Sequence, residues 1–171
     1  MRMNPYRAIT LLSLFLALAS ASAHAQAQNA GRGAGEALSH FDRAMTHHRA
    51  GRYEEAVPNF ERAISLDPNF AEAHNNLGYA YYKMGQYAKA VEALRHACRL
   101  DPGAAVTHSN LGNAYAAWGK YKDAFQSFAR ALRLAPDDPV TYHSLGVAYY
   151  MAKRYGEAAE SFRRAVGLKA N

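Results

Sequence analysis

The chain has 171 residues, half of them hydrophobic, and its 20 Lys and Arg against 14 Asp and Glu give a formal charge of +6. This length suits one compact domain, and the single cysteine, Cys98, excludes an internal disulfide framework. Acidic residues are interspersed with the basic ones, so the charge falls short of the dense basic stripe that nucleic-acid binding needs.

The first 25 residues have the pattern of a secretory signal peptide. Arg2 and Arg7 precede an uncharged, leucine-rich stretch over residues 8–19, and small residues follow at the spacing that signal peptidase prefers. We predict cleavage after Ala25, with Ala23 as the second choice. The mature protein is then periplasmic or secreted and has no membrane span. An uncleaved anchor helix is the alternative, although the apolar run is short for one.

A short leader separates this segment from a repeated region. Residues 26–36 are rich in Ala, Gln and Gly and are predicted to be flexible, and we assign no function to them. Beyond the leader the sequence repeats with a period of 34 residues, in units that cover 37–70, 71–104, 105–138 and 139–171. Such a period predicts a stack of similar units in place of a conventional globule.

Small side chains recur at fixed places within the unit, and large ones recur between them. Small residues let helix backbones approach closely, and large residues fill the gaps. Position 8 holds Ala44, Gly78, Gly112 and Gly146, position 20 holds Ala56, Ala90, Ala124 and Ala158, and position 27 holds Ala63, Ala97, Ala131 and Ala165. Position 17 is tyrosine in all four units, and position 24 carries Phe60, Leu94, Phe128 and Phe162.

Helix-ending residues divide each unit into two helices. Gly51, Gly85 and Gly119 stand where a first helix must end in a left-handed residue, and Pro68, Pro102 and Pro136 stop the second helices. Asp138 and Pro139 form an N-cap and a first helical residue that open the fourth unit. Pro58 lies inside a second helix, where we expect a kink.

This pattern resembles the tetratricopeptide repeat, which has Leu-Gly at positions 7 and 8, an aromatic residue at 11, Ala at 20, an aromatic residue at 24, Ala at 27 and Pro at 32. The match covers residues 37–171 and fails mainly in the terminal units, where Arg43 and Ala44 replace Leu-Gly and Lys153 replaces the turn glycine. The resemblance implies an all-α, right-handed α-solenoid of four helix-turn-helix units. It also implies a concave side that receives peptides or helices of partner proteins.

Candidate binding residues follow from the helical period. Positions 4, 7, 8 and 11 of each first helix form the packed stripe, so positions 2, 5, 6, 9, 12 and 13 point away from it and line the inner curve, beginning with Phe41 and Met45. Asparagine amides and tyrosine rings suit an extended polypeptide. The alternative is a solvated face whose amides only satisfy one another. The predicted peptide-binding groove consists of Asn75, Asn76, Tyr79, Tyr82, Lys83, Asn110, Asn113, His143, Val147 and Tyr150.

Other chemistry is disfavoured. His40, His74 and His108 share position 4 of successive units, but stacked helices lie about 8–10 Å apart, so these rings cannot converge on one zinc ion. Cys98 occupies position 28, which is apolar in the other units, and is interpreted as a core residue. We find no phosphate loop, acid–base carboxylate pair or Ser-His-Asp pattern. The sequence therefore predicts a protein without enzymatic activity, metal or cofactor.

Two functional hypotheses remain. One is an adaptor in a periplasmic or cell-envelope complex, which binds a segment of a partner protein in its groove. The other is a self-associating scaffold subunit, because the sequence stops at the fourth unit's second helix without a polar closing helix. Phe162, Val166 and Leu168 are then expected to be partly uncovered and to favour a homo-oligomer.

Overall fold

The computed structural model describes residues 32–169, and within that range the chain consists of eight helices and no strand. Residues 32–49 are helical, so the last five residues of the predicted leader belong to the first helix. The predicted signal peptide, residues 1–25, lies outside the described residues. The other helices are α2 (Tyr53–Leu66), α3 (Ala71–Lys83), α4 (Tyr87–Leu100), α5 (Ala105–Ala117), α6 (Tyr121–Leu134), α7 (Pro139–Met151) and α8 (Tyr155–Lys169).

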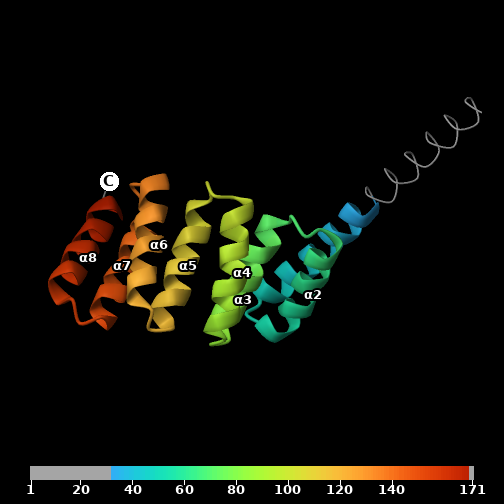
Figure 1. Cartoon of the computed structure of the whole chain (residues 1–171), viewed down its shortest axis with the longest axis horizontal. Coiled ribbons are helices and arrows are strands. Elements are labelled where there is room, and N and C mark those ends of the chain that lie inside the picture. The colour runs from blue at the N-terminus through green and yellow to red at the C-terminus, as the bar shows by residue number, and fades with distance from the viewer. Residues whose placement is uncertain (1–31, 170–171) are drawn as a thin grey trace, which may run out of the picture.

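The helices form four antiparallel pairs that stand side by side along the long axis of the molecule (Figure 1). The first helix of each unit packs against the second helix of the same unit. The second helices α2, α4 and α6 also pack against the first helix of the next unit. First helices also contact one another, α3 with α5 and α5 with α7. Among the described residues, the second helices do not approach one another to a comparable extent. The first helices therefore lie on the inside of the curve, which confirms the predicted all-α solenoid.

Close packing within each unit depends on the small residues at positions 8, 20 and 27. Ala56, Ala90, Ala124 and Ala158 are buried at the contact between the helices of a pair. A Cβ atom added to Gly112 would lie only 2.7 Å from Cε1 of Phe128. Real Cβ atoms do not approach other atoms that closely, so the glycine is needed where an aromatic ring crosses the first helix.

The turns between paired helices have the predicted left-handed residue. Gly51, Gly85 and Gly119 have φ values of 73°, 73° and 78°. Lys153 occupies the same place in the fourth unit with φ of 60°, and it is the one non-glycine residue with positive φ in the described range. The fourth unit therefore keeps the turn geometry of the other three. The Lys153 side chain disfavours this geometry, because the left-handed region costs an L-residue about 1–2 kcal/mol.

Replacing Lys153 with glycine is expected to raise the free energy of unfolding by about 1 kcal/mol, because glycine adopts this φ without the steric penalty. The midpoint of urea denaturation, followed by far-ultraviolet circular dichroism, measures the change. Lys153→Ala is the matched control, since it removes the long side chain but keeps the penalty. Equal stabilisation by both variants would show that the backbone conformation is not the cause.

Pro58 does not interrupt its helix. α2 runs without a break from Tyr53 to Leu66, and its 14 residues equal the length of α4 and α6. The proline removes one backbone donor, so the carbonyl of Glu54 lacks its usual helical partner. α2 therefore continues as one helix through Pro58, and the kink expected there stays a prediction.

Candidate functional site

The exposed side of the first helices, here called the inner face, carries most of the uncovered apolar side chains. Val140, Val147 and Met151 are spaced by seven and four residues along α7, so they lie on one side of that helix. Val106, Val140 and Tyr150 are each 62% exposed. The large exposed apolar residues at inner-face positions, or in contact with one, are Leu38, Val106, Val140, Val147, Tyr150, Met151 and Tyr155. Only Trp118, Leu134 and Val166 lie elsewhere in the described range.

All ten predicted groove residues reach the surface of this face. Lys83, His143, Val147 and Tyr150 are exposed, and the other six are partly buried. Three other residues that the helical period places on this face, Phe41, Ser109 and Ala116, lie in the core instead. Phe41 is 7% exposed, and its ring centre lies 4.7 Å from that of Phe70. Ser109 is buried and accepts a hydrogen bond of 3.0 Å from the Thr141 hydroxyl.

The asparagine amides of the predicted groove are partly satisfied within the protein. Nδ2 of Asn110 donates to Oδ1 of Asn75 over 3.0 Å and joins α5 to α3. Nδ2 of Asn76 donates to the carbonyl oxygen of Glu72, one turn earlier in α3, over 2.9 Å. A guest polypeptide can therefore use only the remaining donors and acceptors of these amides, and the aromatic and apolar side chains form the more accessible part of the face.

Five aromatic rings form a continuous series across the first two units, which we call the aromatic strip: His48, Tyr53, Tyr79, Tyr82 and Tyr87. The ring centres of His48 and Tyr79 are 5.3 Å apart. The pairs Tyr53–Tyr79, Tyr79–Tyr82 and Tyr82–Tyr87 are separated by 6.3, 6.1 and 6.3 Å. Burial, together with the nearby charge of Arg49, lowers the pKa of His48, so this ring is neutral near pH 7.

Sequence reasoning missed several members of this surface. Leu38, Val106 and Val140 occupy position 2, which the helical period assigns to the inner face, but the groove prediction used only positions 5 to 13. Tyr53, Tyr87 and Tyr155 occupy position 17, which was interpreted as packing within the unit. The recurrence of tyrosine at position 17 was the available signal. The turn that joins each helix pair decides whether the tyrosine at position 17 lies beside the first helices.

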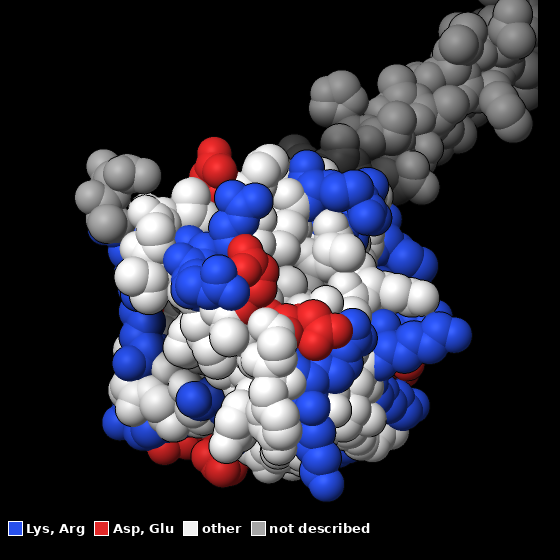
Figure 2. Space-filling model, turned by 90° about the vertical axis from the view of Figure 1, so that its left-hand side faces the viewer, with Lys and Arg blue, Asp and Glu red and all other residues white. Residues whose placement is uncertain are grey.

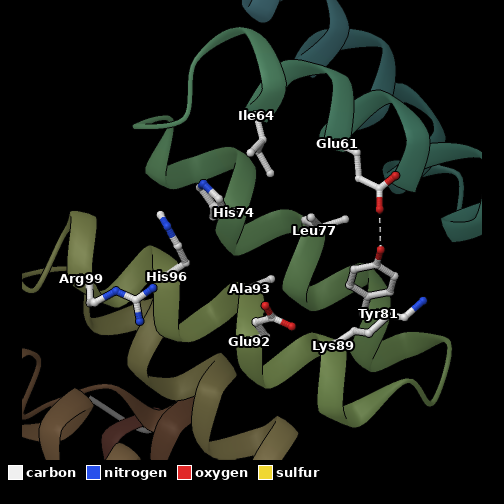
Figure 3. Close-up of a pocket in the computed structure, with 10 residues that line it drawn as sticks. All are labelled: Glu61, Ile64, His74, Leu77, Tyr81, Lys89, Glu92, Ala93, His96 and Arg99. Atoms are coloured by element: carbon white, nitrogen blue, oxygen red, sulfur yellow. Dashed lines mark hydrogen bonds between the residues drawn. The ribbon is translucent and has the colours of Figure 1, made fainter.

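A second hollow, of about 490 Å³, lies on the other side of the first two units, between α2 and α4 with α3 as its floor (Figure 3). Buried Leu77 and Ala93 form the bottom, and exposed Glu61, Glu92, Lys89 and Arg99 form the rim. The Tyr81 hydroxyl donates to Oε1 of Glu61 over 2.6 Å. Burial and this hydrogen bond raise the pKa of Tyr81 to about 12.

The histidines and the cysteine have packing partners. Nε2 of His74 and of His108 each donates over 3.1 Å to the carbonyl oxygen of the proline six residues earlier. Nδ1 of His108 is then left as an acceptor, 3.6 Å from Sγ of Cys98. Burial raises the pKa of the Cys98 thiol to about 11, which keeps it protonated and weakly nucleophilic near neutral pH. Between residues 32 and 169, no cluster of three or more metal-ligating side chains occurs.

Family models match along almost the whole repeated region. A model described as TPR repeat matches residues 46–85, and two described as tetratricopeptide repeat match residues 71–104 and 103–170. The chain belongs to the tetratricopeptide repeat (TPR) family. No curated protein sequence matches this TPR protein.

Solved structures with the same fold include other TPR arrays. A crystal structure of MamA superposes with a TM-score of 0.71 at 24% identity and covers 78% of each chain. The structure of residues 41 to the end of MamA from Desulfovibrio magneticus RS-1 gives 0.72 at 23% identity, over 78% of this chain and 76% of that one. A mutant O-GlcNAc transferase from Thermobaculum terrenum gives 0.65 at 32% identity, over 69% of this chain but 23% of the transferase. These similarities establish the fold.

Proposed function

We propose that this TPR protein is an adaptor that binds a segment of a partner polypeptide along its inner face and performs no catalysis itself. The observation that carries the proposal is that seven of the ten large exposed apolar side chains in residues 32–169 lie on or beside that face. Contiguous exposed apolar surface on a soluble protein marks an interaction site. The opposite faces of the second helices carry mixed charges, which favour solvent.

The inner face suits a polypeptide guest because its chemistry varies along the array. The first two units present tyrosine rings, the centre presents the Asn75–Asn110 amide pair, and α7 presents Val140, Val147 and Met151. Apolar side chains of a guest would gain most from contact with α7, while its backbone would meet the amides. Binding through several such contacts gives affinity without a single deep pocket.

The proposed location is the periplasm or the extracellular space, where the adaptor would serve an envelope complex. This part rests on the signal-peptide pattern of residues 1–25. None of the helices in residues 32–169 is long and apolar enough to cross a membrane. Purified protein from the producing cells is expected to have a mass that lacks residues 1–25, and retention of the full mass would contradict the cleavage.

Self-association is the second candidate, and Val166 favours it. This residue is 68% exposed, whereas Ile64, Cys98 and Leu132 at the same repeat position are partly buried by the next unit. Figure 2 views this end of the array and shows uncharged surface interrupted by many Lys and Arg side chains and a few acidic ones. A second copy that covered this end would bury the uncharged part but would also have to accommodate those charges.

Site-specific photocrosslinking in living cells tests the adaptor. A photoreactive amino acid at Tyr79 or Val147 is expected to capture a partner polypeptide, because both positions lie on the inner face. The same group at Arg130, an exposed position on the outer side of α6, is the control and should give no matching product. Equal capture at all three positions would contradict the adaptor. A product of twice the chain's mass, formed from Val166 alone, would favour the scaffold instead.

A further inference from the structure

The aromatic strip is confined to the first two units. Tyr121 has the same repeat position as Tyr53 and Tyr87, yet it makes no ring contact within the described residues. The reason is local: Ala116 and Ala117 stand in α5 where Tyr82 and Lys83 stand in α3. The third unit therefore interrupts the series. The fourth unit repeats only its last pair, because Tyr150 and Tyr155 have the repeat positions of Tyr82 and Tyr87 and their ring centres lie 5.5 Å apart.

The hydroxyl groups of the strip are available to a ligand. Tyr81 uses its hydroxyl to bind Glu61 inside the protein. By contrast, Tyr53, Tyr79, Tyr82 and Tyr87 make no side-chain hydrogen bond with any other residue in the range 32–169. Each of these phenols can donate a hydrogen bond, and each is only partly buried. The strip thus offers partly exposed rings whose hydroxyl groups can donate hydrogen bonds.

A proline-rich segment has the complementary chemistry. Proline lacks a backbone N–H, so a run of prolines offers carbonyl acceptors and no backbone donors. In the polyproline II conformation these carbonyls point outward because no internal hydrogen bonds form. Grooves lined by aromatic rings recognise this conformation, and the ligand loses little entropy because it is already extended.

Two exposed cations stand beside the strip. Arg49 and Lys83 share position 13 of the first two units, where the third and fourth units have Ala117 and Met151. Lys83 lies one turn after Tyr79 on the same side of α3. These charges favour a segment with exposed carbonyls or an acidic residue next to its prolines and disfavour a basic one. An amphipathic helix would instead need aliphatic surface, which lies at the other end of the inner face.

We propose that the aromatic strip binds a proline-rich segment of the partner in the polyproline II conformation, with tyrosine hydroxyls donating to its carbonyl groups and with no basic residue beside its prolines. The proposal rests on the adaptor function and specifies the part of the guest that the first two units hold. The aliphatic surface of α7 then receives a different part of the same guest.

Calorimetric titration of the full chain with synthetic peptides tests this assignment. A ten-residue proline peptide with one terminal Glu is expected to bind, and a Gly/Ser peptide of the same length and charge is expected to bind at least about tenfold more weakly. Replacing Tyr82 with alanine should weaken proline-peptide binding by at least about tenfold. The milder Tyr87→Phe keeps the ring and removes one hydroxyl group. This change should weaken proline-peptide binding roughly two- to tenfold.

Tyr121→Phe is the matched control, because it removes the same atom from the same repeat position outside the strip and should leave binding unchanged. Equal binding of the proline and Gly/Ser peptides would overturn the proposal, as would equal effects of Tyr87→Phe and Tyr121→Phe. If an amphipathic Leu/Lys peptide bound through Tyr82 while the proline peptide did not, the polyproline assignment would fail and the adaptor function would stand. Absence of binding by all three peptides, together with failed crosslinking at Tyr79 and Val147, would reject both.

Discussion

Replacement of Phe128 with alanine is expected to lower the free energy of unfolding by about 3–5 kcal/mol. The Phe128 side chain is 0% exposed and lies in a cluster with Ala116, Ala124 and Ala148, so its removal leaves a cavity between the third and fourth units. In a linear array each unit contacts only its neighbours, so the loss weakens the attachment of α7 and α8 to the rest. The midpoint and the amplitude of denaturation, followed by circular dichroism, measure the effect.

Phe162→Ala is the comparison for this prediction. Phe162 has the same repeat position and crosses Gly146 as Phe128 crosses Gly112, but it is only partly buried at the end of the array. Its replacement is expected to cost less than half as much, because part of its surface is already in contact with solvent. Equal losses for the two variants would show that burial of Phe128 between units does not account for its contribution. Phe128→Leu should retain most of the stability if the native state of the alanine variant is too weak to measure.

Gly112→Ala is expected to lower the free energy of unfolding by about 1–2 kcal/mol, although alanine is the better helix former. The new Cβ would meet three atoms of the Phe128 ring within 2.8 Å, and that ring is fully buried and cannot move without disturbing its neighbours. Thermal unfolding monitored by circular dichroism measures the loss. At a position free of this crossing, the same change would stabilise a helix by up to about 1 kcal/mol.

Gly146→Ala separates the packing effect from helix propensity. Its Cβ would approach Cε1 of Phe162 to 2.6 Å, which is as close as the contact at Gly112. Because Phe162 is partly exposed, its ring can move outward into solvent. Gly146→Ala should therefore lower the free energy of unfolding less than Gly112→Ala does. A slight increase fits the same reasoning, because alanine is the better helix former. A larger loss at Gly146 than at Gly112 would contradict the packing explanation.

Most of the fold could be predicted from the residues that end the helices and from the small residues at helix contacts. Gly51, Gly85 and Gly119 marked the turns, and their positive φ values confirm the prediction. The alanines at positions 20 and 27 marked helix contacts, and they are buried. These predictions were accurate because they depend on local backbone geometry or on a contact that recurs in every unit. The start of the first helix was less accurate, because residues 32–36 are helical in spite of their glycines.

The candidate site was predicted less completely. The helical period placed ten residues on one face, of which four are exposed and six partly buried, and their role as a peptide-binding groove stays a prediction. It did not place Phe41 in the core, where its ring packs against Phe60 and Phe70. Ser109, at the same repeat position in the third unit, is buried as well and contacts Thr141 of the next unit. Burial at this position therefore depends on contacts between units, which the repeat position does not specify.

The sequence by itself determined the four helix pairs, the small residues at their crossings and most of the residues on the side of each first helix that points away from the core. These features depend on spacings of a few residues within one unit. Only the tertiary structure decided which side chains of neighbouring units meet, as Asn75 with Asn110 and Tyr53 with Tyr79 do. Such contacts depend on the rotation and offset between successive units. Small changes in either would separate these groups by several ångströms, so the accessible chemistry of the face arises from the stacking of the units.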